Sequence, residues 1–244
     1  MVPPSIPRRD IDGLLLVDKP TGMTSHDVVD AIRRKFQLSK VGHGGTLDPM
    51  ATGLLVILLG RGTRLFEQVM SSDKEYRGTL HLGITTDSHD RDGEAIATGD
   101  YSDISREMVQ AEMEKWKGDV LQTPPMISAI KKDGVPLYKL ARRGREVERK
   151  PRLIHVYRFD LLDFDPPRAR FRLKCTKGTY VRTLCHDVGR GLGCGAFLEE
   201  LRRMAVGRFT VGEACSLHRV LGMSVAELER SVIPVSRFLL DESG

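Results

Sequence analysis

The chain of 244 residues has few features that mark membrane, secreted or metal-binding proteins. Its longest purely aliphatic run, Leu54–Leu59, is far too short to cross a bilayer and predicts a buried strand. The first thirteen residues lack the apolar core of a signal peptide. None of the four cysteines lies in a CxxC pair, so we expect neither a zinc site nor a disulfide framework. Free thiols in a reducing compartment favour a cytoplasmic protein.

The sequence also lacks the GxGxxG, Walker and metal-ligand motifs, and we expect no cofactor and no metal. The net charge of +5 mildly favours a polyanionic partner. Much of this charge is local, since residues 139–152 carry seven Lys or Arg against two Glu. This segment fits either a solvated helix end followed by a strand, or a ridge that contacts phosphates.

The apolar pattern predicts a mixture of strands and helices without regular alternation. Strands are expected over Gly13–Val17, Leu54–Leu59, Glu75–Gly83, Met126–Lys131, Leu153–Asp163 and Ala169–Thr176. Helices are expected after Thr24 or Ser25, from Ser105 to about Trp116 with Gly118 at the end, over Pro136–Arg143, and along the Val181, Leu184, Val188 and Leu192 face. This order favours an α+β fold with a largely antiparallel or mixed sheet.

One carboxylate, Asp48, lies in a glycine-rich loop within Val41–Leu55. The glycines allow sharp turns and a close approach by a ligand, and Pro49 biases Asp48 away from helix. An aspartate held in this way can act as a nucleophile or a base. Taken alone, an Asp-Pro pair more often begins a turn.

Five stretches together carry a family resemblance. They are Gly13–Val29, Val41–Leu55, Asp73–Glu94, Gln122–Gly144 and Lys177–Arg203. In this order and spacing, from about Ile11 to about Pro234, they resemble the bacterial branch of the TruB family of tRNA pseudouridine synthases. The resemblance implies the pseudouridine synthase fold, with a long mixed sheet and with helices and loops around a central catalytic cleft. It also implies isomerisation of uridine to pseudouridine at position 55, in the TΨC loop of tRNA, after base flipping.

The resemblance implies roles for seven side chains. Asp48 would be the nucleophile, Arg182 the cation that keeps it ionised and aimed, and Tyr76 a catalytic ring packed on the target base. The substrate would also be bound by Tyr180, Leu201, His43 and Lys19, the last bracing the loop or touching the RNA backbone. Without the resemblance, each of these residues fits an ordinary turn, surface or core position. Whether Asp48 attacks C1′ of the ribose or C6 of the base stays open.

The Asp-rich loop around Asp90 and Asp92 resembles a family linker that is not catalytic, so neither residue is a predicted site residue. We expect a mobile arm over residues 1–10, a catalytic domain over 11–215 and a short helical extension over 216–244. Family members usually continue into an RNA-binding domain of the PUA type, which we expect to be missing here. Its absence would weaken tRNA affinity and leave the chemistry intact.

The expected partner is the T arm of tRNA. We expect the protein to be a monomer that needs no guide RNA and does not associate with membranes. Two alternatives remain. The protein could be a tRNA-folding chaperone in which modification is incidental, because the basic segment and pocket would serve both roles. It could also be a pseudouridine synthase that acts on another structured RNA.

Overall fold

The structure is a computed structural model that describes residues 10–127, 131–132, 135–136 and 147–240. The chain forms two units, one from Met1–Lys74 with Arg202–Gly244 and the other from Glu75–Leu201. Most of the predicted N-terminal arm and of the predicted helix over Pro136–Arg143 lies outside the described residues. Within the described part of the chain, no helix is both long enough and apolar enough to cross a membrane.

The first unit is built on two long buried strands. β1 (Gly13–Lys19) and β3 (Thr52–Leu59) pair antiparallel, from Gly13 opposite Leu59 to Lys19 opposite Gly53. Short strands extend them: β2 (Val41–His43) pairs with β3, and β14 (Cys215–Ser216) lies parallel to β1. β12 (Ala196–Val206) runs parallel to β3 and is followed by β13 (Phe209–Thr210). Unbroken apolar runs suit β1 and β3 because both of their faces are covered.

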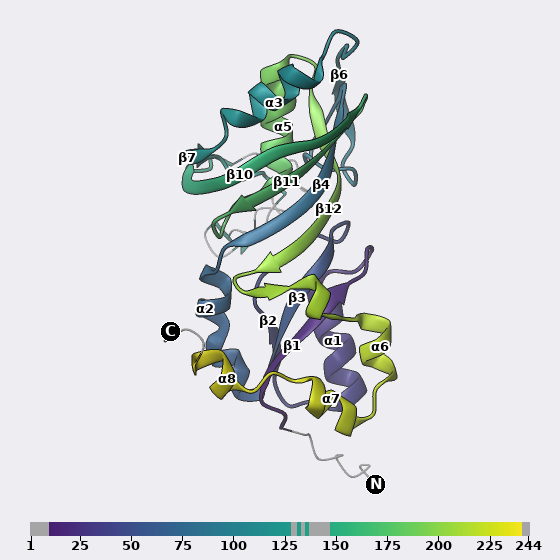
Figure 1. The fold of residues 1–244 in the computed structure, drawn as a ribbon, viewed down its shortest axis with the longest axis vertical. Helices are drawn as coiled ribbons and strands as arrows, with labels where there is room; N and C mark the ends of the chain where they lie inside the picture. The colour runs from purple at the N-terminus through teal and green to yellow at the C-terminus, as the bar shows by residue number, and fades with distance from the viewer. Residues whose placement is uncertain (1–9, 128–130, 133–134, 137–146, 241–244) are drawn as a thin grey trace. The chain divides into compact units, whose positions relative to one another are not determined.

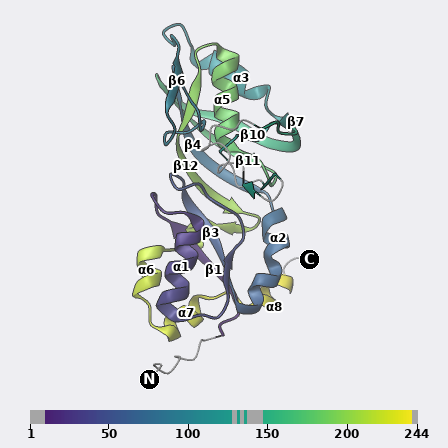
Figure 2. The same cartoon turned by 180° about the vertical axis from the view of Figure 1, so that it is seen from behind.

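Helices cover both faces of these strands (Figures 1 and 2). One face packs against α1 (Ser25–Phe36), α6 (Leu217–Gly222) and α7 (Val225–Ser231), with Leu15 and Ile57 in the shared core. The other face packs against the 3₁₀ helix η1 (Gly60–Leu65), α2 (Phe66–Ser71) and α8 (Val235–Leu240). Thr24 caps α1 through a capping box with Asp27, which confirms the predicted start of this helix.

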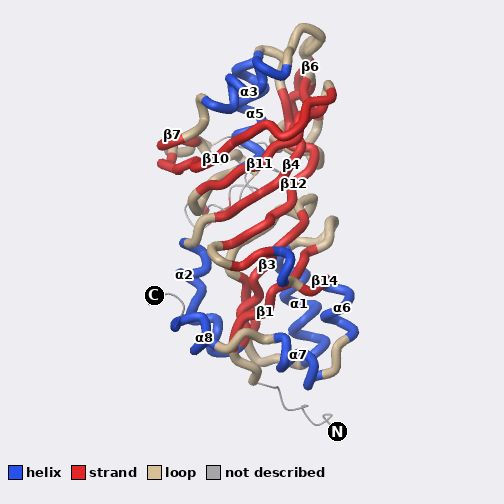
Figure 3. The backbone as a smooth tube through the Cα atoms, viewed as in Figure 1, coloured by secondary structure: helices blue, strands red, loops and turns tan. Residues whose placement is uncertain are grey.

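The second unit has its strands in the order β12, β4 (Lys74–Leu82), β11 (Arg168–Cys175), β10 (Arg152–Asp165) and β7 (Gly118–Gln122), as Figure 3 shows. β10 is antiparallel to both β11 and β7. The rings of Phe159 and Phe171 meet edge to face with centroids 5.3 Å apart. Helix α3 (Arg106–Glu114) contacts both β10 and helix α5 (Val181–Leu192). Two further antiparallel pairs are β5 (Ile84–Thr86) with β6 (Ala95–Thr98) and β8 (Lys131–Lys132) with β9 (Val135–Pro136).

The mixed sheet with flanking helices confirms the predicted α+β class. Two local predictions are wrong. Helix α3 ends at Glu114 because the following turns tighten, with the Trp116 N–H bonded to the Met113 carbonyl. Gly118, expected to end that helix, has a φ of +85° and begins β7. Met126 and Ile127, expected in a strand, lie in a bend that follows two prolines.

Gly53 marks a close contact that only glycine permits. Its φ is +100°, and a Cβ there would lie 2.3 Å from the backbone oxygen of Arg203 on β12. We expect Gly53→Ala to lower the free energy of unfolding by about 2–4 kcal/mol, the sum of backbone strain and overpacking. The matched control is Gly193→Ala, because Gly193 has a φ of +83° and open space around it. It should lose only about 1 kcal/mol in urea titrations. Equal losses would contradict the contact.

Candidate active site and family

A buried arginine binds the backbone carbonyls of the loop before Asp48. Arg203, 1% exposed, donates from Nε to the Leu54 carbonyl at 2.7 Å. Its Nη2 and Nη1 donate to the carbonyls of Gly45 and Thr46, at 3.0 and 3.3 Å. A buried guanidinium needs such acceptors, because a charge without partners is costly in the protein interior. The loop backbone therefore has to present its carbonyls to Arg203.

A serine at the start of α1 holds the residue next to Asp48. The Leu47 N–H donates to Ser25 Oγ at 2.8 Å, and Ser25 Oγ contacts the Leu47 carbonyl at 3.2 Å. Both Ser25 and Leu47 are buried. This two-point contact ties the loop to a rigid helix one residue before the predicted nucleophile.

Lys19, at the end of β1, holds the residue after Asp48. Its ammonium donates to the carbonyls of Met23, Pro20 and Pro49, at 2.6, 2.9 and 3.2 Å. The side chain is fully buried. Burial lowers the pKa of Lys19 to about 8, and the negative charge of Asp48 opposes this shift. The ammonium thus supports the loop and supplies positive charge to Asp48.

Asp48 itself is half-buried between these two supports. The Ala51 N–H donates to the Asp48 carbonyl at 3.1 Å, so the residue also begins a turn. The turn and the chemical interpretation of Asp-Pro are therefore compatible: the turn fixes the backbone, and the carboxylate remains partly accessible.

His43, on β2, lies half-buried near the same loop. Burial lowers the pKa of His43, and the positive charge of Arg203 lowers it further. The Gly45 N–H donates to His43 Nδ1 at 3.4 Å. An imidazole that is neutral near pH 7 suits contact with a base better than pairing with a phosphate.

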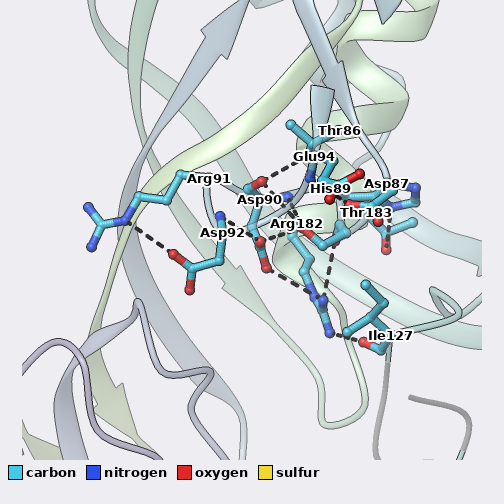
Figure 4. Close-up of polar contacts among 11 residues, drawn as sticks. Thr86, Asp87, His89, Asp90, Arg91, Asp92, Glu94, Ile127, Arg182 and Thr183 are labelled. Carbon is cyan, nitrogen blue, oxygen red and sulfur yellow. Dashed lines mark hydrogen bonds and ion pairs between the residues drawn. The ribbon is translucent and has the colours of Figure 1, made fainter. Parts of the chain in front are cut away.

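Arg182, in the first turn of α5, is 4% exposed and bound by acceptors from separate loops (Figure 4). Its Nη1 lies 3.2 Å from the Ser88 carbonyl and 3.5 Å from Asp90 Oδ2. Its Nη2 donates to the Ile127 carbonyl at 2.5 Å. The side chain is therefore a fixed, buried cation. Arg182 is therefore not an ordinary surface arginine near the start of a helix.

Asp90 is a residue that sequence reasoning set aside. It is 5% exposed and pairs with Arg182, while its Oδ1 accepts from Ser88 Oγ at 2.5 Å and from the Asp92 N–H at 3.1 Å. Asp92, in contrast, is exposed. The short Ser-x-Asp pattern indicates a local turn, but nothing in it identifies a partner 92 positions away.

The other predicted side chains of the second unit lie on α5, β4 and β12. Tyr180 is the N-cap residue of α5, and Arg182 Cζ lies 5.8 Å from its ring centroid. Tyr76 is half-buried on β4, on the same face as Gly78 because side chains alternate along a strand. A Cβ at Gly78 would lie 2.5 Å from the Phe171 ring, so this face is closely packed. Leu201, 8% exposed, lies on β12, the strand next to β4.

The seven predicted residues divide between the two units. Lys19, His43 and Asp48 belong to the first, and the second holds Tyr76, Tyr180, Arg182 and Leu201. The pairing of Arg182 with Asp48 stays a prediction. Arg203 and Ser25 also contact the loop, although their sequence patterns gave no sign of it. Among the described residues, no group of three or more His, Cys, Asp and Glu side chains is arranged to hold a metal ion.

The buried Lys19 predicts a pH dependence of stability. In the folded protein this lysine loses its proton near pH 8, but in the unfolded chain it does so near its ordinary value of 10.5. Between these values the unfolded chain binds more protons. The free energy of unfolding contributed by Lys19 therefore rises with pH, by at most about 1.4 kcal/mol per pH unit.

Lys19→Met removes this dependence. The wild-type minus variant difference in free energy of unfolding, from urea titrations, should be constant below about pH 8 and rise above it. A difference that stays constant up to about pH 10 would contradict the lowered pKa.

Two family models match the chain. The model described as TruB family pseudouridylate synthase (N terminal domain) matches residues 33–181. The model described as tRNA pseudouridylate synthase B C-terminal domain matches residues 182–240. Together they span residues 33–240, which include parts of both units.

Curated relatives agree with the family models. The chain is 52% identical over 229 residues to tRNA pseudouridine synthase B of Opitutus terrae, covering 94% of this chain and 95% of the relative. It is 49% identical to tRNA pseudouridine synthase B of Syntrophotalea carbinolica, covering 94% of this chain and 75% of that one.

A solved structure shares the fold. It is titled "Crystal Structure of a Cbf5-Nop10-Gar1 Complex" and is 29% identical, with a TM-score of 0.72. The match covers 92% of this chain and 60% of the solved chain, so this chain spans less than two thirds of that relative. These similarities confirm the resemblance carried by the sequence motifs: the chain belongs to the TruB family of pseudouridylate synthases.

Proposed function

We propose that this protein isomerises uridine to pseudouridine at position 55, in the TΨC loop of tRNA, with Asp48 as the nucleophile. The observation that carries the proposal is the support of the Asp48 loop on both sides, by Ser25 at Leu47 and by Lys19 at Pro49. The names of the curated relatives support tRNA as the substrate.

The reaction is an isomerisation, and its atoms balance without a second substrate. The bond between ribose C1′ and uracil N1 breaks, and a bond between C1′ and C5 forms. C5 loses its proton, and N1 gains one. The step needs a nucleophile that forms a transient bond and later leaves, which an ionised, immobilised carboxylate can do. The uracil must first leave its stack, at a cost of a few kcal/mol.

Arg182 is the proposed cationic partner of Asp48. A guanidinium can bind a carboxylate through two parallel hydrogen bonds, which would keep Asp48 ionised and aimed. The contacts of Arg182 with the Ser88 and Ile127 carbonyls and with Asp90 support this role, since they fix the guanidinium before substrate binds. Asp90 is then a positioning residue that acts through Arg182.

The remaining predicted residues would hold the flipped base. Tyr76 would pack on the ring and help move a proton, and Tyr180 and Leu201 would line the pocket. His43, neutral near pH 7, would fill the space that the base leaves in the RNA. Burial of Leu201 and partial burial of both tyrosines support these roles.

We further propose that the protein acts as a cytoplasmic monomer without a guide RNA. The catalytic domain would span residues 11–215, with residues 216–244 as a helical extension that includes α6, α7 and α8. The exposed Lys150 and Arg152, at the end of the basic segment, would contact tRNA phosphates.

Asp48→Asn tests the nucleophile. The amide has the shape of the carboxylate but cannot attack, so pseudouridine formation should be lost while the dissociation constant for tRNA stays within about twofold. Single-turnover assays on an unmodified tRNA transcript measure product formation, and filter binding of the same transcript measures the dissociation constant. The matched control is Asp92→Asn, because Asp92 is exposed and should leave the rate unchanged.

Full activity of Asp48→Asn would contradict the assignment. The same variant separates the two functional classes. A tRNA-folding chaperone would retain its activity in a tRNA-folding assay with Asp48→Asn, and the wild type would make no stoichiometric product under single-turnover conditions.

Arg182→Lys tests whether the planar guanidinium, with its several N–H donors, is needed. The ammonium keeps the charge but cannot satisfy the separate acceptors and a carboxylate together, so the single-turnover rate should fall at least about tenfold, or about 1.4 kcal/mol. Arg190→Lys on the same helix is the matched control, since Arg190 is largely exposed and pairs with Asp187 at 2.9 Å. Equal rates for the two variants would show that the guanidinium is not needed.

A further inference from the structure

Strand β7 ends in a buried glutamine that holds the backbone of Tyr180. Gln122 is 2% exposed. Its Nε2 donates to the Tyr180 carbonyl at 3.1 Å, and the Tyr180 N–H donates to Gln122 Oε1 at 2.8 Å. The two contacts reproduce the pair of hydrogen bonds that a neighbouring strand would make. A side-chain amide is suited to this because it carries a donor and an acceptor side by side.

The contact falls where the chain changes from loop to helix. Tyr180 is the N-cap residue of α5, and its own side chain makes no capping hydrogen bond. The Tyr180 carbonyl also accepts from the N–H groups of Thr183 and Leu184, at 3.1 and 3.2 Å. Gln122 therefore fixes the residue from which α5 departs. The directions of the Tyr180 ring and of Arg182, two residues later, depend on that backbone.

The segment that starts at Gln122 contacts the start of α5 a second time. Five residues on, the Ile127 carbonyl accepts from Arg182 Nη2. Between the two contacts lie Thr123, Pro124, Pro125 and Met126, and the two prolines restrict φ. The Pro124 carbonyl is itself held by Arg149 Nη1 at 3.2 Å. Residues 122–127 thus hold the helix start at its backbone and at its arginine.

We propose that Gln122 is a positioning residue for the isomerisation, acting through the backbone of Tyr180 on the Tyr180 ring and on Arg182. This inference rests on the proposed function. The requirement is chemical: the side chain at position 122 must donate and accept at once. An apolar side chain of the same length fills the space but leaves a buried N–H and a carbonyl without this partner. A carboxylate accepts but cannot donate, whereas a protonated carboxyl does both.

The decisive variant is Gln122→Glu, measured against pH beside Gln122→Met. At about pH 8 the introduced carboxylate faces the Tyr180 carbonyl, and the single-turnover rate should be at least about tenfold below wild type. Burial at position 122 favours the neutral form of the introduced carboxyl, so the ratio to the wild-type rate should recover several-fold as the pH falls to about 5.5. Gln122→Met should stay slow at every pH. The KM for tRNA should change less than about twofold in both variants, because the loss lies in the chemical step.

A matched control is Gln110→Glu, on α3. Gln110 also accepts from a backbone N–H, that of Leu161 on β10 at 3.1 Å, but its Nε2 donates to Glu114 on its own helix, at 2.9 Å. The single-turnover rate of Gln110→Glu, divided by the wild-type rate, should not vary with pH. Urea midpoints measured at each pH establish that the compared proteins are folded, so that the ratio reports positioning.

The outcomes separate the two proposals. Wild-type product with an unimpaired Gln122→Met would overturn the role of Gln122 and leave the function standing. A folded Gln122→Glu that is equally slow at about pH 8 and about pH 5.5 would overturn the requirement that residue 122 both donates to and accepts from the backbone of Tyr180. If the wild type makes no pseudouridine, the proposed function fails first, and the role of Gln122 in it fails with it.

Discussion

The burial of two cations against backbone carbonyls is the constraint on which the Asp48 loop depends. Lys19 and Arg203 are both essentially inaccessible to solvent, and together they contact six carbonyl oxygens of the first unit. A buried charge is tolerated only where hydrogen-bond partners replace water. The loop can therefore adopt only conformations that turn these carbonyls inward. With Leu47 fixed by Ser25 and Pro49 by Lys19, Asp48 has little backbone freedom. Such restraint reduces the reorganisation required in a reaction.

The second unit uses the same principle with different groups. Arg182 binds the Ser88 carbonyl and the Asp90 carboxylate in one chain segment and the Ile127 carbonyl in another, so its direction is set by two segments. Gln122 supplies a neutral counterpart, fixing the backbone of Tyr180 without a charge. Lys19 in the first unit and Arg182 and Gln122 in the second are thus oriented chiefly by hydrogen bonds to backbone groups.

The parts of the fold that depend on local pattern could be predicted from the sequence. The capped start of α1 at Thr24, the alternation along β4 and the apolar runs of β1 and β3 are all properties of neighbouring residues. The end of α3 could not, because it depends on a tightening of the last turns and on the φ of Gly118. Asp90 and Arg203 were missed for a related reason. Their partners lie 92 and more than 140 positions away, and only the fold brings them together.

The central claim is that the supported carboxylate of Asp48 serves one reaction at one nucleotide. The most direct measurement is a nucleotide-resolution map of pseudouridine in an unmodified tRNA transcript after a single turnover with the wild-type protein. We expect one new pseudouridine, at position 55 of the TΨC loop. A transcript that is bound but unchanged, or modified only outside that loop, would contradict it.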